Sequence, residues 1–281
     1  MPLRTGSALL AVHAAVALFA LAALFGKWIA LSAIAIVLGR TAFAALALGL
    51  TLRIRGRPAG IPTPALAGNG AILALHWVSF FAAVQSASVA VALLGYASFP
   101  LFVLVMERAA VPQVAAGPRY AAAALVIAGL LLIVPAFSWS DRASRGLVWG
   151  LVSGASFAWL AVRNRGLVAA EDPARIALWQ NAVAAACLLP IAALGGAQAW
   201  PTARDLALLA VLGIVCTALA HTLFIASMRR VSAHVASVVA ALEPVYGIAL
   251  AAWLLGEIPG SRTLAGAALI VAAAIVASRR A

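Results

Sequence analysis

The chain has 281 residues, of which 66% are hydrophobic and 9% are charged, and its mean hydropathy is +1.11. This composition excludes a water-soluble globular domain and indicates a polytopic membrane protein, with a single membrane domain over residues 1–281. The formal net charge of +12 comes from basic residues scattered between apolar segments, which argues against nucleic-acid binding.

In chain order, the sequence divides into ten apolar segments with the character of membrane-spanning helices. They cover approximately residues 7–26, 30–52, 69–87, 89–106, 118–135, 146–163, 174–194, 206–226, 233–253 and 263–278. The connections between them are too short to hold a soluble domain. We therefore expect an all-α protein of ten transmembrane helices in a lipid bilayer.

The basic residues are distributed unevenly between the two sides of this arrangement. With the amino terminus inside, thirteen of them fall in cytoplasmic segments and five in external segments, while Arg40 lies within the second span. Cytoplasmic loops of membrane proteins carry an excess of Lys and Arg. The sequence therefore predicts that both termini are cytoplasmic.

The chain also repeats itself when it is shifted by 144 residues without gaps. The shift places Leu75 on Leu219, Phe80 on Phe224, Ser88 on Ser232, Pro100 on Pro244 and Leu125 on Leu269. Residues 1–137 and 138–281 then hold five spans each, and an odd number of spans inverts the second half relative to the first. We expect a 5+5 inverted-topology repeat, an arrangement typical of transporters whose substrate site lies near the bilayer midplane.

The ninth predicted helix carries Glu243 and Pro244 side by side at its middle. Proline removes a backbone hydrogen bond, and a carboxyl group at this depth costs several kcal/mol unless it is paired or hydrated. We interpret the pair as a helix break used for function, with Pro100 marking the corresponding break in the first half. The alternative is a packed kink in which a protonated Glu243 makes a helix contact.

The ten short helices, the repeat, the stretch LEPVYGIALAAWLLGE at 242–257 and the proline in the matching fourth helix resemble the EamA-type branch of the drug/metabolite transporter superfamily. The resemblance implies a secondary transporter of the bacterial inner membrane that exports amino acids, aromatic ones included, or related metabolites by alternating access. It also implies a central cavity lined by helices 1–4 and 6–9, with helices 5 and 10 peripheral. Phe99 stands at the repeat position of Glu243, which leaves Glu243 as the candidate for ion coupling.

Aromatic and histidine side chains recur at matching depths in the two halves, and His221 occupies the repeat position of Trp77. We expect these side chains to line the cavity, although packing between helices is the alternative interpretation. The predicted lining consists of His76, Trp77, Phe80, Tyr96 and Phe99 from the first half and Trp159, His221, Phe224 and Tyr246 from the second.

Arg40 lies in the middle of the second predicted helix, where a cation must face the bundle or an aqueous cavity. It can hold a substrate carboxylate, because its planar guanidinium bonds both oxygens. Gln180 or Asn181 on the seventh helix is an equally good candidate partner. Glu243 would engage an amino group of the substrate or carry a coupling proton.

Other classes of function find little support. Enzyme motifs such as HExxH, GxSxG and the Walker GK[ST] are missing from the sequence, and Cys187 and Cys216 lie inside apolar spans, so we expect no cofactor and no metal. A carrier for cationic drugs or nucleotide-linked sugars is the main alternative to an amino-acid exporter. A membrane scaffold without transport is a weaker alternative, and the pattern leaves the oligomeric state open, including a monomer.

Overall fold

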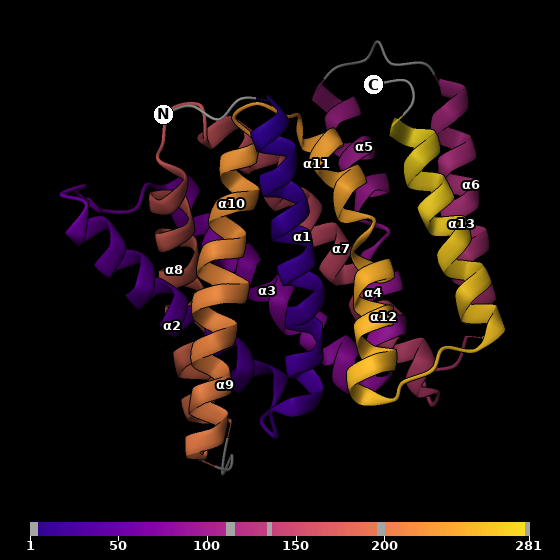
Figure 1. Ribbon diagram of the computed structural model, residues 1–281, viewed down its shortest axis with the longest axis horizontal. Helices are drawn as coiled ribbons and strands as arrows, with labels where there is room; N and C mark the ends of the chain where they lie inside the picture. The colour runs from indigo at the N-terminus through magenta and orange to yellow at the C-terminus, as the bar shows by residue number, and fades with distance from the viewer. Residues whose placement is uncertain (1–4, 111–115, 134–136, 196–199, 279–281) are drawn as a thin grey trace.

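The computed structural model describes residues 5–110, 116–133, 137–195 and 200–278, and all of its regular elements are helices. Figure 1 shows them standing side by side as one bundle. Their bounds are α1 Thr5–Trp28, α2 Ala33–Ile54, α3 Pro64–Ser86, α4 Val89–Tyr96, α5 Phe99–Ala110, α6 Ala116–Ile133, α7 Arg142–Leu167, α8 Pro173–Leu194, α9 Ala203–Gly213, the π-helical turn η1 Ile214–Leu219, α10 Ala220–Ser227, α11 Ala233–Ala240, α12 Glu243–Leu255 and α13 Ser261–Ser278.

These elements combine into ten helices within the described residues, because α4 continues into α5, α9 into η1 and α10, and α11 into α12. Six helices are long and apolar enough to cross a membrane in one piece, and four shorter apolar helices accompany them. The prediction of an all-helical polytopic membrane protein is thus confirmed. The spans predicted at 89–106 and 233–253 are each interrupted in the middle.

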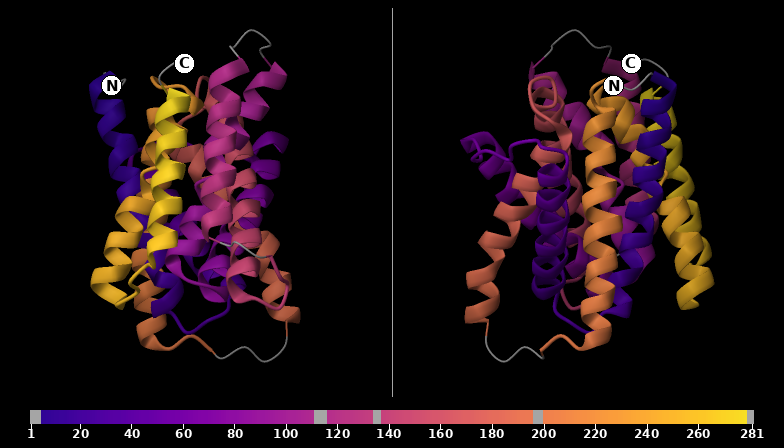
Figure 2. Two further views of the ribbon diagram at one scale, coloured as in Figure 1. Left: turned by 90° about the vertical axis from the view of Figure 1, so that its right-hand side faces the viewer. Right: turned by 60° about the vertical axis from the view of Figure 1, so that its left-hand side comes forward.

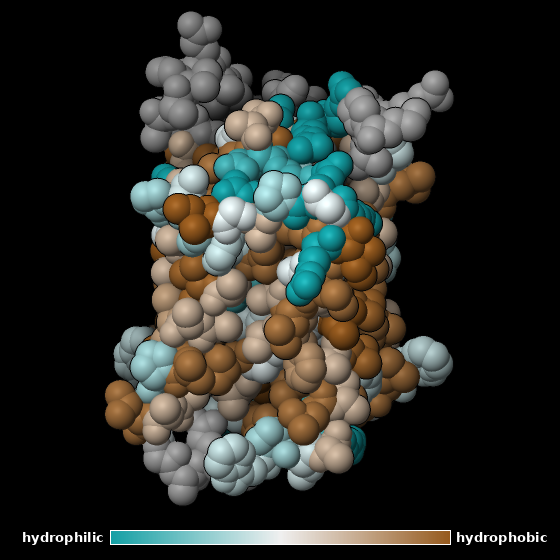
Figure 3. Space-filling model, turned by 90° about the vertical axis from the view of Figure 1, so that its left-hand side faces the viewer, coloured by the Kyte–Doolittle hydropathy of each residue, from teal (hydrophilic) through white to brown (hydrophobic). Residues whose placement is uncertain are grey.

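The surface has the polarity expected of a membrane protein. Figure 3 shows one face of the bundle, on which hydrophobic residues cover most of the middle and hydrophilic residues gather toward the end at which the termini lie. Large apolar side chains such as Leu46, Leu50 and Leu194 are 71%, 59% and 86% exposed. Figure 2 shows from two further sides that α1 begins and α13 ends at the same end of the bundle.

Local sequence explains where many of the helices begin. The first residues of a helix have unpaired N–H groups, and a side-chain oxygen at the N-cap satisfies one of them. Seven of the described helices use this device: Ser32, Thr63, Ser88, Asp141, Asp172, Thr202 and Ser232 cap α2, α3, α4, α7, α8, α9 and α11. At Asp141, hydrogen bonds from the backbone and hydroxyl of Ser144 lower the pKa of the carboxyl group below its ordinary value.

Small residues on α7 bring this helix close to the middle of α4 and α5. A Cβ atom at Gly150 would lie 3.0 Å from the Cα of Gly95, and one at Gly154 would lie 2.9 Å from both Ser98 Oγ and the Tyr96 carbonyl oxygen. Small residues permit such close approach between membrane helices. The glycine face therefore sets α7 against the point at which α4 ends and α5 begins. At one edge of the bundle, α6 and α13 pack against each other (Figure 1).

Candidate functional site

Two helix breaks place polar groups in the middle of the bundle. The chain turns at Ala97 and Ser98 between α4 and α5, and at Ala241 and Leu242 between α11 and α12. Each break is followed by a proline at the second position of the new helix, where a missing N–H removes no helical bond. The breaks leave Tyr96 as the last residue of α4 and Glu243 as the first residue of α12, and the two side chains lie in the wall of the same cavity.

This central cavity is small, with a volume of about 20 Å³. That volume holds about one water molecule, so a larger solute enters only if the surrounding helices move apart. The wall combines one cation, one carboxyl group and one imidazole with aromatic rings. Its residues are Phe19, Ala22, Arg40, His76, Trp77, Phe80, Tyr96, Phe157 and Glu243.

Arg40 is 1% exposed and is held by α9–η1–α10 rather than by α8. Its Nε donates to Thr217 Oγ1 at 2.9 Å and its Nη2 donates to the Cys216 carbonyl at 3.4 Å. The guanidinium also stacks on the Trp77 ring, 4.0 Å from its centroid, which is a favourable cation–π position. The expectation that Gln180 or Asn181 partners Arg40 is therefore wrong.

The two amides considered as partners form their hydrogen bonds elsewhere, and Asn181 Oδ1 is buried without a hydrogen-bond partner among the described residues. Gln180 Nε2 donates to Asn164 Oδ1 at 2.6 Å, and Asn181 Nδ2 donates to the Ala177 carbonyl at 2.8 Å. Asn69 and Arg163 complete this buried network, with Asn69 donating to Asn164 Oδ1 and Arg163 donating to Asn69 Oδ1. The network joins α3, α7 and α8 and leaves Arg40 to the cavity.

Aromatic rings form a second layer around the cavity. Phe157 of α7 belongs to the wall and connects it to this layer, because its ring centroid lies 4.7 Å from His76, 5.0 Å from Phe99 and 5.2 Å from Phe224. Phe99 and Phe224 are 0% and 1% exposed and pack behind the wall rather than in it. Aromatic pairs at such distances stabilise a defined packing, so the wall has a rigid backing.

The two buried histidines differ in their surroundings. His76 Nδ1 is 2.9 Å from Ser153 Oγ and 3.0 Å from the Ser153 carbonyl, which fixes the orientation of its ring. His221 is 1% exposed and packs against Trp77 at 5.7 Å, and among the described residues neither of its ring nitrogens has a hydrogen-bond partner. One carboxyl oxygen of Glu243 is likewise unpartnered within that part of the chain.

Four of the nine residues predicted to line the cavity lie in its wall, namely His76, Trp77, Phe80 and Tyr96. Three others, Phe99, His221 and Phe224, are buried outside the wall, and the remaining two are partly exposed. Trp159 is 46% exposed, with Arg163 5.7 Å from its ring centroid, and Tyr246 is 39% exposed. Trp159 faces away because successive helical residues turn by 100°, so it points almost opposite to the buried Phe157. Sequence reasoning missed Phe157, although it lies one turn after Gly154 on the glycine face of the same helix. Phe19 of α1 was missed as well, and nothing in its apolar neighbourhood distinguishes it.

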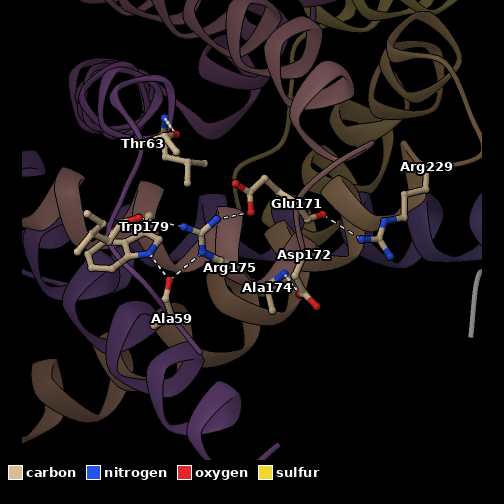
Figure 4. A network of polar contacts seen from close by, with 10 residues as sticks. Ala59, Thr63, Glu171, Asp172, Ala174, Arg175, Trp179 and Arg229 are labelled. Atoms are coloured by element: carbon tan, nitrogen blue, oxygen red, sulfur yellow. Dashed lines mark hydrogen bonds and ion pairs between the residues drawn. The ribbon is translucent and has the colours of Figure 1, made fainter. Parts of the chain in front are cut away.

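Polar contacts close the bundle at the end where the termini lie (Figure 4). Arg175 donates to the Ala59 carbonyl at 2.8 Å and pairs with Glu171, while Trp179 Nε1 donates to the same carbonyl at 2.9 Å. Arg229 donates to the Glu171 carbonyl at 2.9 Å. These bonds tie the α2–α3 connection to the α7–α8 and α10–α11 turns.

A second set of contacts closes the opposite end. Lys27 donates to the Ala87 carbonyl at 2.9 Å and lies 3.6 Å from the Glu257 carboxylate, which accepts from the Val89 N–H at 2.9 Å. Gln85 Nε2 donates to the Leu31 carbonyl at 2.8 Å. The cavity is therefore separated from both ends by packed and hydrogen-bonded turns. Across the described residues, no group of three His, Cys, Asp or Glu side chains is placed to hold a metal ion.

Comparison with known proteins agrees with this architecture. The profile of the EamA-like transporter family matches residues 144–279. An uncharacterized transporter of Archaeoglobus fulgidus is 31% identical over 229 residues, which are 79% of each chain. The pseudopaline exporter CntI of Pseudomonas aeruginosa is 29% identical over 262 residues, covering 89% of this chain and 87% of that protein.

A solved crystal structure has the same fold. It superposes with a TM-score of 0.77 over 99% of this chain and 100% of the other, at 19% sequence identity. At this identity the likeness concerns the fold alone.

Proposed function

Because the chain belongs to the EamA-like transporter family, we propose that it is a secondary transporter that exports amino acids, aromatic ones among them, across the bacterial inner membrane. The family and the named relatives make it a membrane transporter of small molecules rather than an enzyme. One observation carries the choice of substrate: a cation and a carboxyl group, Arg40 and Glu243, are buried in the same aromatic cavity. An amino acid is a zwitterion whose two charges match these two groups.

The roles of the wall residues follow from their chemistry. Arg40 receives the carboxylate of the substrate, and Glu243 receives its ammonium group or, in the alternative role, carries a coupling proton. Trp77, Phe80 and Phe157 receive an apolar side chain, whose burial contributes roughly 1.5–3 kcal/mol. After the costs of binding are subtracted, this supports recognition in about the micromolar to millimolar range.

We also propose that the two halves form an inverted 5+5 repeat, residues 1–137 and 138–281, with both termini in the cytoplasm. In support, α4 ends 144 residues before α11 does, at Tyr96 and Ala240, and α5 begins 144 residues before α12. The two broken helices run in opposite directions along the bundle (Figure 1). Gln85 and Arg229, also 144 residues apart, each bond a carbonyl next to the first helix of their own half. Alternating opening of the two closed ends would move substrate through the cavity.

Release of amino acids from cells tests the assignment. Cells that express the protein and are loaded with a phenylalanine-containing dipeptide should release free phenylalanine faster than cells with the empty vector. A release rate equal to that of the control cells, for every amino acid supplied in this way, would reject the substrate and leave the carrier fold standing.

Another solute class remains the alternative, and one observation favours it: the relative from Pseudomonas aeruginosa is named an exporter of pseudopaline rather than of an amino acid. A carrier of purely cationic drugs is disfavoured by Arg40 in the cavity wall, because a cationic solute would be repelled there.

A further inference from the structure

The π-helical turn η1 provides the hydrogen-bond acceptors that hold the side chain of Arg40. A π-helix has one extra residue in its turn, and short π-helical segments occur frequently at functional sites. Here the turn lies inside the continuous helix Ala203–Ser227 and faces the middle of α2. Thr217 and Cys216, both 0% exposed, present a hydroxyl group and a carbonyl group to the guanidinium. Sequence reasoning assigned neither residue a role beyond membrane packing.

The hydroxyl group of Thr217 has a fixed direction. It donates to the Leu212 carbonyl at 2.7 Å, which uses its only hydrogen atom. Toward Arg40 it can then act only as an acceptor, and Arg40 Nε donates to it at 2.9 Å. With Nη2 donating to the Cys216 carbonyl, the Nε–Nη2 edge of the guanidinium is occupied by the turn.

The backbone of α2 is held against the same turn. A Cβ atom at Gly213 would lie 2.7 Å from the Arg40 carbonyl oxygen and 2.6 Å from Phe43 Cβ, so the two helices meet with no space for a side chain. One face of the guanidinium is covered by the Trp77 ring at 4.0 Å. The backbone of Arg40 is therefore held by the contact with Gly213. Its guanidinium is held along the Nε–Nη2 edge by the turn and on one face by Trp77.

The remaining edge of the guanidinium carries Nη1 and the second hydrogen of Nη2. Arg40 lines the cavity together with Glu243 and His76, and no described residue accepts a hydrogen bond from its Nη1. Two parallel N–H groups of this kind match the two oxygens of a carboxylate. A guanidinium that turned freely would lose this match, because its other edge could compete for the same ligand.

We propose that Thr217 is a positioning residue, which holds Arg40 in the π-helical turn so that its Nη1–Nη2 edge meets a carboxylate of the transported solute. The inference rests on the proposed function in that it assigns the cavity to solute binding, and it adds that a free carboxylate is required. Selectivity for this group then depends on a hydroxyl that does not touch the solute.

Ligand binding to the purified protein in detergent tests the inference. The probes are carboxylates paired with their amides: phenylalanine with phenylalaninamide, and 3-phenylpropionate with 3-phenylpropionamide. Dissociation constants come from the rise in melting temperature with ligand concentration, because a ligand that binds only the folded state stabilises it. The wild type should bind each carboxylate at least about tenfold more tightly than its amide, as expected for a charge-assisted hydrogen-bonded pair.

Two variants separate positioning from packing. Thr217→Val keeps the shape of the side chain and removes the hydroxyl group, so the preference for carboxylate over amide should fall to about twofold or less. Thr217→Ser restores the hydroxyl and should restore the preference. A merely structural role would weaken carboxylate and amide binding equally and leave the ratio unchanged. Thr217→Ala, which adds no bulk, replaces the valine variant if that protein fails to fold.

The outcomes distinguish this inference from the proposed function. It is overturned if the wild type shows no preference for carboxylates, or if the hydroxyl-free variant keeps the full preference. If 3-phenylpropionate binds with the predicted preference and phenylalanine does not bind, the amino-acid assignment fails and the role of Thr217 stands.

Discussion

Among the described residues of the cavity wall, Glu243 is the only acidic one, and it is 3% exposed. A carboxyl group buried among aromatic rings is retained at a high free-energy cost, which points to use in binding or coupling. One of its carboxyl oxygens is buried without a hydrogen-bond partner among the described residues, which leaves it available for a substrate ammonium group.

Glu243→Gln should therefore reduce transport of amino acids at least about tenfold. Glutamine keeps the shape of the side chain and removes the charge, and loss of one partner from a buried charged pair has an effect of this size or larger. The measurement is initial exchange in proteoliposomes, with gel filtration to show that the variant is folded. Exchange within twofold of the wild type would exclude both a binding and a coupling role for the carboxyl group.

Trp77 and Trp159 form a matched pair of substitutions. Trp77 is 4% exposed, lies in the cavity wall and stacks on Arg40, whereas Trp159 is 46% exposed. Trp77→Ala should slow phenylalanine release about tenfold or more, because it removes buried apolar area and the support of the guanidinium. Trp159→Ala should leave release near the wild-type rate. Equal effects of the two substitutions would contradict the position of the cavity.

For individual residues, the sequence identified the polar side chains of the site better than the aromatic ones. A charged side chain within an apolar span is conspicuous, which is why Arg40 and Glu243 could be recognised. An aromatic ring is equally at home against lipid, against a neighbouring helix or in a cavity. Only the rotation of α7 within the bundle distinguishes Phe157 from Trp159, and that rotation is set by tertiary packing.

Among the elements, the broken helices α4–α5 and α11–α12 shape the site, and α7 supports the first break. Gly154 has no space for a methyl group, because a Cβ atom there would lie 2.9 Å from Ser98 Oγ and from the Tyr96 carbonyl. The neighbouring atoms belong partly to the backbone, so they can yield only if the break itself shifts.

Gly154→Ala should therefore lower the melting temperature in detergent and reduce transport, although alanine is the better helix former. Gly68 of α3 is the control, since a Cβ atom there meets nothing within 4 Å. Gly68→Ala should leave the melting temperature unchanged or raise it, because alanine is favoured over glycine by about 1 kcal/mol within a helix. Loss of stability in both variants, or in neither, would show that the contact between α7 and the break is unimportant.

Element positions could be predicted largely from apolar length, and both breaks from Pro100 and Pro244. The π-helical turn could not be predicted, because nothing in the sequence around Cys216 and Thr217 departs from an ordinary membrane helix. The partners of Arg40 escaped prediction for the same reason. The role of the turn depends on its hydrogen bonds to Arg40 of α2, which lies 176 residues before Cys216 in the sequence.

For the whole molecule, the arrangement of the chain in the membrane can be tested by cysteine labelling. Arg55→Cys and Ser140→Cys place single exposed thiols in the α2–α3 connection and before α7, in a background in which the exposed Cys187 is replaced by alanine. In intact cells, a membrane-impermeant reagent should label the thiol at 140 and spare the thiol at 55, because the arginine-rich connection stays inside. Labelling of both thiols from outside would contradict the proposed topology.

Passage of amino acids through the central cavity is the central element of the proposed function. Counterflow in proteoliposomes tests it most directly: vesicles loaded with unlabelled phenylalanine take up trace radiolabelled phenylalanine, with and without a pH gradient. We expect transient accumulation of label above that of empty vesicles, and a clear reduction of that accumulation in vesicles containing Glu243→Gln. Accumulation no greater than in protein-free vesicles, for phenylalanine and for a panel of other amino acids, would contradict the claim.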